Sequence, residues 1–206
     1  MIPLDRHMAV AAVVLLMVLA ACREAPPRAT ILPGSVTLRA GDIVFRRGQG
    51  VMSHAVTTAD RGGQYSHVGV IADSCGVLMV VHAVPGEPDY EGDVDRVKMD
   101  TPERFFSTAY AAIGEVFRPQ DSVRAARVAD LVLQVYKRRV MFDHDYDDTD
   151  TTKMYCTELV TFVLRRAGYD VSSLVYSDFR IPGMNVHCIL PSAVARLPFL
   201  RSVATF

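Results

Sequence analysis

The chain has 206 residues, with 22 Lys and Arg against 23 Asp and Glu, a formal net charge of -1, and half of its residues hydrophobic. This balance lacks the excess of basic residues on which nucleic-acid affinity depends, so we expect no nucleic-acid partner. A chain this apolar buries enough surface to fold, and its length after processing fits one compact domain rather than two.

The N-terminus is predicted to be an export signal. Arg6 and His7 precede an apolar run from Met8 to Ala21, which is shorter than the roughly 20 residues that a membrane-spanning helix needs. Residues 1–21 are therefore expected to be a signal peptide that is removed, and not a membrane anchor.

The end of this run resembles the lipobox of bacterial lipoproteins. It reads Leu19-Ala20-Ala21-Cys22 and is followed by Arg23. Lipidation of Cys22 would tether the protein to a membrane of the bacterial cell envelope, and because no Asp follows the Cys we expect the periplasmic face of the outer membrane. The alternative is ordinary secretion, with Cys22 incidental. Residues 22–34 contain three Pro and a Gly and are expected to be a lipidated tether, so the domain spans 35–206.

The strand signals occur in neighbouring pairs. Strands are predicted at Asp42–Phe45, Tyr65–Ala72, Val77–Val84 and Ile113–Arg118, with a short helix at Val51–Thr58. Since strands follow one another rather than alternating with helices, the fold class should be α+β with a mainly antiparallel sheet.

Three further helices are predicted. One begins at Thr101-Pro102-Glu103, with Pro at its first position, and one runs from Asp121 or Ser122 to about Val140. The third has the clearest apolar periodicity in the chain, with Gly168 placed to end it and its apolar residues at Cys156, Leu159, Val160, Val163, Leu164 and Ala167.

Cys156 stands on the first turn of that third helix. The positive end of a helix dipole favours a thiolate there and lowers the pKa of the thiol, which is how a nucleophilic Cys is usually placed. The alternative is that Cys156 simply begins a buried apolar stripe, since free Cys is often buried.

The predicted hairpin places two His residues together. If the loop Asp73-Ser74-Cys75-Gly76 closes Ala72 against Val77, then His67 lies directly opposite His82 on one face of the sheet. An imidazole near a thiol acts as its base, and a second polar ring holds the first in position. A zinc site of two His and one Cys is the alternative, but no C-x-x-C or H-x-x-x-H spacing supports it, and we expect neither a metal nor another cofactor.

Three segments resemble the signature blocks of the YiiX/YebB-like cysteine hydrolases, the circularly permuted, papain-like branch of the NlpC/P60 superfamily. They are Gly41-Asp42-Ile43-Val44-Phe45, Tyr65-Ser66-His67-Val68-Gly69-Val70 and Tyr155-Cys156-Thr157-Glu158-Leu159-Val160. The permutation is implied by their order, since the His block precedes the Cys block.

The resemblance implies a permuted papain-like fold in which Cys156 is the nucleophile, His67 its base and His82 the orienting residue. Many members have Glu at the third position, and His occurs in related branches that act on lipid acyl groups. Backbone N–H groups at the start of the Cys156 helix are candidate oxyanion donors. Tyr155 is a further candidate for substrate or oxyanion contact, or else packs at the helix entrance.

The remaining reactive groups leave alternatives open. Cys75 and Cys188 would form a disulfide or remain two free thiols. The acidic segment Asp143–Asp150 suggests a calcium site, but it lacks the Gly and Glu of an EF-hand loop. We therefore expect it to be a solvated loop.

The resulting expectation is a membrane-anchored cysteine hydrolase that cleaves an amide bond in a peptidoglycan peptide or another N-acyl amide. Two alternatives stand beside it: an acyl hydrolase or acyltransferase directed at lipid, and a non-catalytic lipoprotein that binds a ligand. A lipid-directed activity is favoured by His82 and by the tether, whereas the amide activity follows from the likeness in fold, which is a weaker argument.

Overall fold

The computed structural model describes residues 29–61, 63–150, 152–181 and 184–206. The predicted signal peptide, Cys22 and the tether up to residue 28 lie outside these ranges. Within them, every helix is too short or too polar to cross a membrane.

The main sheet has eight strands in the order β10-β5-β1-β2-β3-β4-β6-β7, and every neighbouring pair except β6 and β7 is antiparallel. The expectation of an α+β fold with a mainly antiparallel sheet is therefore confirmed. The strands are β1 (Ile43–Arg47), β2 (His67–Ser74), β3 (Val77–Val84), β4 (Arg96–Asp100), β5 (Ile113–Pro119), β6 (Met141–Phe142), β7 (Lys153–Met154) and β10 (Leu200–Thr205).

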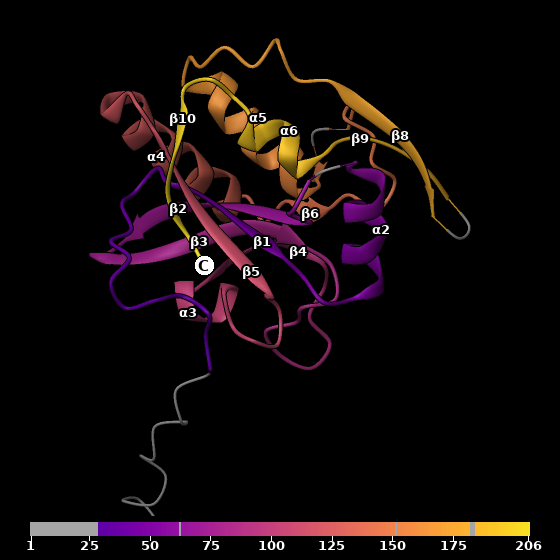
Figure 1. Ribbon diagram of the computed structural model, residues 1–206, viewed down its shortest axis with the longest axis horizontal. Helices are drawn as coiled ribbons and strands as arrows, with labels where there is room; N and C mark the ends of the chain where they lie inside the picture. The colour runs from indigo at the N-terminus through magenta and orange to yellow at the C-terminus, as the bar shows by residue number, and fades with distance from the viewer. Residues whose placement is uncertain (1–28, 62, 151, 182–183) are drawn as a thin grey trace, which may run out of the picture.

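Two long helices cover one face of this sheet (Figure 1). They are α4 (Ser122–Lys137) and α5 (Cys156–Arg166), and both contact β2. Their apolar stripes pack against the alternate residues of β2 and β3 that face them, such as Val68, Val70 and Val81, which form one buried core. The predicted helix nucleating at Cys156 is confirmed, and Gly168 ends it with a φ of 91°.

The opposite face carries a smaller core around α3 (Pro102–Phe105). Phe105 and the adjacent Phe106 pack there against apolar side chains of β1, β2 and β3. Residues 29–32 also lie on this face, where the Ile31 N–H donates to the Phe106 carbonyl. The contacts of the domain therefore begin before residue 35, within the segment expected to be a tether.

Gly41 and Asp42 of the first signature block serve the fold. Gly41 has a φ of 89°, and a Cβ there would lie 2.3 Å from the Ala125 carbonyl oxygen, so only Gly lets the chain pass α4 this closely. The buried Asp42 carboxylate accepts two hydrogen bonds of 2.8 Å from Arg118 on β5. This pair ties the start of β1 to its neighbouring strand.

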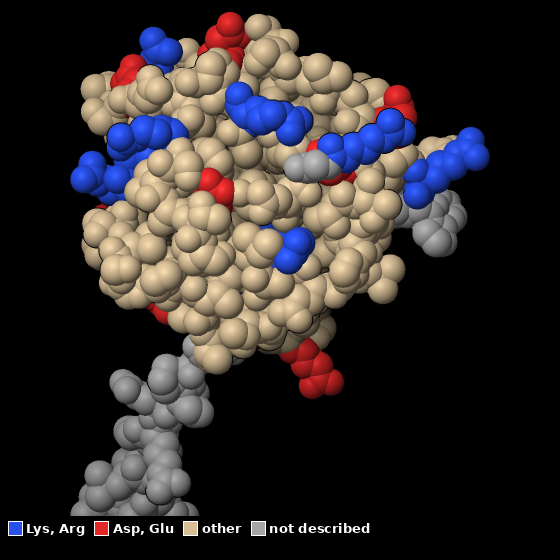
Figure 2. Space-filling view, in the orientation of Figure 1, with Lys and Arg blue, Asp and Glu red and all other residues tan. Residues whose placement is uncertain are grey.

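Several elements in the C-terminal part of the domain were not predicted from the sequence. Strands β8 (Tyr176–Ile181) and β9 (Met184–Ile189) form a separate two-stranded sheet, followed by α6 (Pro191–Ala195). This ribbon lies on the same side of the molecule as α2 (Val51–Ala59), which contacts β8 (Figure 1). On the face drawn in Figure 2, Lys and Arg side chains lie in several places separated by uncharged surface.

The register of the β2–β3 hairpin differs from the expectation by two residues. Ser74 pairs with Val77, so the turn is the two-residue sequence Cys75-Gly76, with φ values of 57° and 84°. Positive φ at both turn positions is the geometry that matches the twist of the strands, and here Cys75 adopts it although it is not Gly. A shift of two residues preserves the face to which each side chain points.

Candidate functional site

His67 and His82 are in direct contact, although they are not directly opposite. His67 Nε2 lies 2.8 Å from His82 Nδ1, and both side chains are buried. Continuing the observed register, His82 stands opposite Gly69, so the two rings meet diagonally across the strands. The prediction that both rings lie on one face of the sheet is confirmed, whereas the predicted register is wrong by two residues.

Gly69 makes this diagonal contact possible. A Cβ at Gly69 would lie 2.7 Å from Val80 Cγ1 and 3.1 Å from His82 Cβ, which is closer than side chains pack. His82 crosses the space that a larger residue would fill. The close approach of Val80 and His82 thus explains why the second signature block has Gly at position 69.

Both rings point to the face of the sheet on which α3 lies. Their ring centroids are 5.7 and 5.1 Å from that of Phe105. Helix α5 packs on the other face, so Cys156 does not meet the pair through the shared core. Instead, its sulfur lies at the end of β2, where the backbone N–H of Val68, the residue after His67, is directed at it.

One cleft contains both the thiol and the first imidazole. Cys156 and His67 line a cavity of about 320 Å³. Among the described residues, no hydrogen bond joins the Cys156 sulfur to either ring. Catalytic hydrogen bonds are often long in the absence of substrate, so the shared cleft is the relevant observation.

The walls of this cleft are largely apolar. They come from elements distant in the sequence, namely α2, the β8–β9 ribbon and the segments around β6 and α6, and include Met52, Val56, Phe142, Phe179, Leu190 and Pro191. Polar side chains, among them Arg46, Gln49 and Glu87, also line the cleft. A mainly apolar wall with polar groups at fixed places is typical of sites for small organic ligands. The position of the ribbon over the cleft was not predicted, since no local pattern indicates this packing.

The expected lowering of the Cys156 pKa is wrong. Burial of the thiol raises its pKa to about 11, against the smaller opposing effects of the backbone N–H groups and of the Arg46 charge. The helix terminus does favour the thiolate, but removal from water outweighs it. In this structure the sulfur is a neutral thiol that needs a base.

Both imidazoles are held neutral. Burial is the main cause that lowers the pKa of His67 well below its usual range, and the positive charge of Arg46 and then the neighbouring His82 ring add to this effect. Burial also lowers the pKa of His82, although the neighbouring Asp100 carboxylate opposes it. A neutral His67 that lines the same cleft as the neutral thiol is able to accept a proton.

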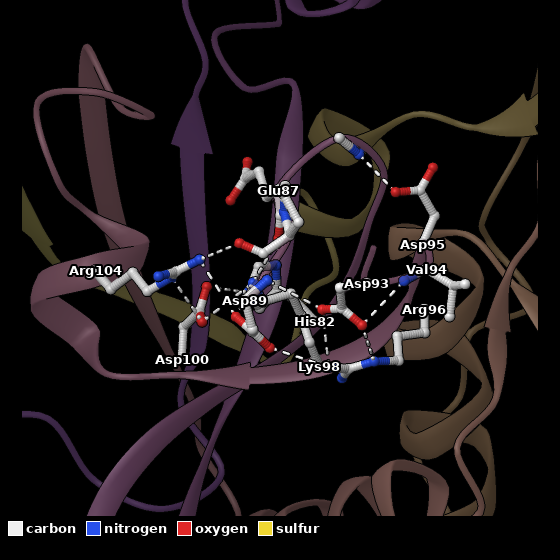
Figure 3. A network of polar contacts seen from close by, with 12 residues as sticks. His82, Glu87, Asp89, Asp93, Val94, Asp95, Arg96, Lys98, Asp100 and Arg104 are labelled. Carbon is white, nitrogen blue, oxygen red and sulfur yellow. Dashed lines mark hydrogen bonds and ion pairs between the residues drawn. The ribbon is translucent and has the colours of Figure 1, made fainter. Parts of the chain in front are cut away.

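Asp100, which contacts the second ring, was not predicted as a site residue. Its Oδ2 lies 3.1 Å from His82 Nε2, and both groups are buried. Strand β4 alternates charged with apolar residues, and this period-2 pattern is the signal that could have identified the strand and its carboxylate. Asp100 belongs to a polar network around the β3–β4 loop, which Figure 3 shows with Glu87, Asp89, Asp93, Arg96, Lys98 and Arg104.

Tyr155 lines the cleft, but its hydroxyl is already engaged. It donates a 2.7 Å hydrogen bond to Asp148, and the ring is buried against Tyr146. Burial and then the Asp148 carboxylate raise the pKa of Tyr155. These contacts favour packing at the entrance of α5 over a role as an oxyanion donor.

The acidic segment uses its carboxylates for its own loop. Asp143 accepts hydrogen bonds from the N–H groups of Asp145 and Asp147, and Asp147 accepts from Thr149. In the described part of the chain, no cluster of three His, Cys, Asp or Glu is arranged to hold a metal ion. The residues thus support a structured polar loop.

Three cysteines of the described residues are free: Cys75, Cys156 and Cys188. Cys75 is exposed at the hairpin turn, whereas Cys188 on β9 is buried and lines the same cleft as Cys156. The disulfide between Cys75 and Cys188 is therefore absent. The alternative of two buried free thiols is correct for Cys188 and wrong for Cys75, which is exposed.

The chain matches no protein-family model and no curated protein. Among solved structures, it is similar in fold to the metalloprotein yiiX of Escherichia coli O157:H7, which belongs to DUF1105. The TM-score is 0.63 at 18% sequence identity, and the match covers 82% of this chain and 97% of that one. This similarity agrees with the predicted YiiX-like relationship at the level of the fold.

Proposed function

We propose that this protein is a cysteine hydrolase that transfers an acyl group to water through a thioester on Cys156. The observation that carries the proposal is a cleft lined both by a thiol on the first turn of a helix and by one member of a buried imidazole pair. A nucleophile, a base and a residue that orients the base are the three parts that such chemistry requires.

The protonation states fit a general-base mechanism. His67 would accept the Cys156 proton as the sulfur attacks the carbonyl carbon of the substrate, and would pass this proton to the leaving nitrogen or oxygen. A water molecule, deprotonated by His67, would then attack the thioester, release the carboxylic acid and regenerate the thiol. Each proton removed from Cys156 or water is thus returned within one cycle.

The oxyanion of each tetrahedral intermediate needs donors near the sulfur. The backbone N–H groups of Cys156 and Thr157 already point toward the sulfur and belong to the first turn of α5. Helix N-termini stabilise anions because these N–H groups have no partner within the helix. They are our candidates for the oxyanion site.

The proposed bond is an amide, in a peptidoglycan peptide or another N-acyl amide. The apolar lining of the cleft favours a second candidate, a lipid acyl ester, because a long acyl chain would bury its methylene groups there. A lipid anchor on Cys22 remains part of this proposal, since it would hold the cleft near a membrane and the cell wall.

The proposal is tested by trapping the acyl-enzyme. Purified protein would be incubated with p-nitrophenyl acyl esters of increasing chain length, and the acylated residue mapped by mass spectrometry. We expect the adduct on Cys156, its loss in Cys156→Ala, and acylation slowed by about 10²- to 10⁴-fold in His67→Asn. Cys188→Ala is the matched control, because it removes the other thiol of the same cleft.

Natural substrates then separate the two candidates. Cell-wall fragments and phospholipid vesicles would each be incubated with the wild-type protein and with Cys156→Ala. A Cys156-dependent cleaved amide supports the first candidate, and release of fatty acid alone supports the second. An adduct only at the exposed Cys75, with equal behaviour of wild type and Cys156→Ala, would overturn the hydrolase proposal in favour of a binding protein.

A further inference from the structure

The two oxygens of Asp100 have different partners. Oδ2 contacts His82 Nε2 at 3.1 Å, whereas Oδ1 lies 3.4 Å from Lys98 Nζ and 3.0 Å from Arg104 Nε. Lys98 also donates to the Glu87 carbonyl and to Asp89, which binds the β3–β4 loop to the strand (Figure 3). Oδ1 therefore faces cations, whereas Oδ2 is the oxygen that contacts the ring.

We propose that Asp100 is a positioning residue which, through His82, fixes the proton of His67 on Nε2 and leaves its Nδ1 free to act as the base. The hydrogen bonds run inward from the Asp100 carboxylate through His82 to His67. It rests on the proposed function in assigning the base to His67, while the arrangement of protons itself depends only on the geometry.

The position of the proton on each ring follows from the hydrogen bond that the ring makes with its neighbour. An ionised carboxylate only accepts, so His82 must donate to it from Nε2–H. A neutral imidazole carries one N–H, so His82 Nδ1 is then an acceptor, and the 2.8 Å contact requires His67 to donate from Nε2–H. The remaining nitrogen of a neutral His67, Nδ1, carries a free lone pair.

The charges around Asp100 keep it ionised. Burial alone would raise its pKa, but the hydrogen bond with His82 and the positive charges of Lys98 and Arg104 outweigh burial and lower the pKa to about 2. The charged groups that act on the imidazole pair from the elements around it are Arg46 on β1, Glu87 in the β3–β4 loop and Asp100 on β4. Lys98 on β4 and Arg104 on α3 face the Asp100 carboxylate, and Cys156 on α5 lines the same cleft as His67.

The substitution Asp100→Asn should reverse the whole chain of protons. Lys98 and Arg104 are donors only, so they would attract the amide oxygen and turn the amide NH₂ toward His82. His82 would then accept at Nε2 and donate from Nδ1, which leaves His67 accepting at Nε2 and protonated on Nδ1. A base already protonated at the nitrogen that should receive the thiol proton cannot act.

The proton positions can be measured directly. Nitrogen-15 NMR of histidine-labelled protein near neutral pH is expected to show His67 and His82 both protonated on Nε2 in the wild type, and both on Nδ1 in Asp100→Asn. A wild-type spectrum with either ring protonated on Nδ1 would overturn the inference. This measurement needs no substrate and therefore tests Asp100 even if the protein is not an enzyme.

The matched control is Asp89→Asn. Asp89 pairs with Lys98, Arg96 and Arg104 in the same network but contacts neither imidazole. We expect acylation of Cys156 by p-nitrophenyl acetate to fall by about 10²- to 10⁴-fold in Asp100→Asn and to change less than threefold, roughly, in Asp89→Asn.

The two proposals fail in different ways. The positioning role of Asp100 would be overturned if Asp100→Asn and Asp89→Asn acylated Cys156 at the same rate, whether both matched the wild type or both were slower by the same factor. The acylation chemistry of Cys156 would stand in either case. Absence of acylation at Cys156 in the wild type would overturn the proposed function, and the NMR spectra would still decide the proton positions.

Discussion

Glu158, two residues after Cys156 in helix α5, should make the stability of this protein fall as the pH rises. Its carboxyl is buried and accepts the Tyr155 N–H at the start of the helix. Burial, together with the nearby charges of Asp148 and Asp143, raises its pKa from the ordinary 4.5 to about 8. The folded protein therefore binds the proton more tightly than the unfolded chain does.

The size of the effect follows from these two pKa values. The gap between 4.5 and about 8 corresponds to about 5 kcal/mol at about 1.4 kcal/mol per pKa unit. This contribution is fully present below pH 4.5 and is lost as the pH rises through about 8. Between pH 5 and 7 the free energy of unfolding should fall by about 2 to 3 kcal/mol from this residue alone.

Glu158→Gln removes the titration while keeping an oxygen that accepts the Tyr155 N–H. Urea unfolding from pH 4 to 9 should show wild type and variant closest at low pH, with the variant progressively more stable above pH 5. The difference between the two curves isolates Glu158, because the imidazole titrations are common to both. Glu103→Gln, at an exposed position on α3, is the control and should follow the wild type. Parallel curves for wild type and Glu158→Gln would refute this reasoning.

Two further predictions concern residues of the signature blocks. Gly69→Ala would place a methyl group 2.7 Å from Val80 Cγ1, so we expect the free energy of unfolding in urea to fall by about 1 to 3 kcal/mol. We also expect His82 to be displaced, which would change its NMR signal. An unchanged signal and an unchanged unfolding midpoint would show that the approach is not tight. Asp42→Ala would leave Arg118 without its carboxylate, at a cost of about 3 kcal/mol with an unchanged dependence on urea concentration. A loss below about 1 kcal/mol would mean that solvent replaces the pair.

Local patterns in the sequence determined the elements that carry the site. The apolar spacing after Cys156 and the Gly at 168 predicted α5 correctly, since helix periodicity and capping are properties of neighbouring residues. The hairpin predicted between Tyr65–Ala72 and Val77–Val84 likewise put His67 and His82 on one face. That result survived a wrong register because the error was two residues, which is the period of a strand.

Only the tertiary structure decided the register, the environment of the thiol and the third member of the hydrogen-bonded chain. The turn residue Cys75 adopts a positive φ that no local rule assigns to Cys. The pKa of Cys156 depends on how completely the domain covers it, and Asp100 reaches His82 because β4 pairs with β3, a contact between segments that no local pattern specifies. Burial and contacts between distant segments arise from packing of the whole chain, so patterns among neighbouring residues could not predict them.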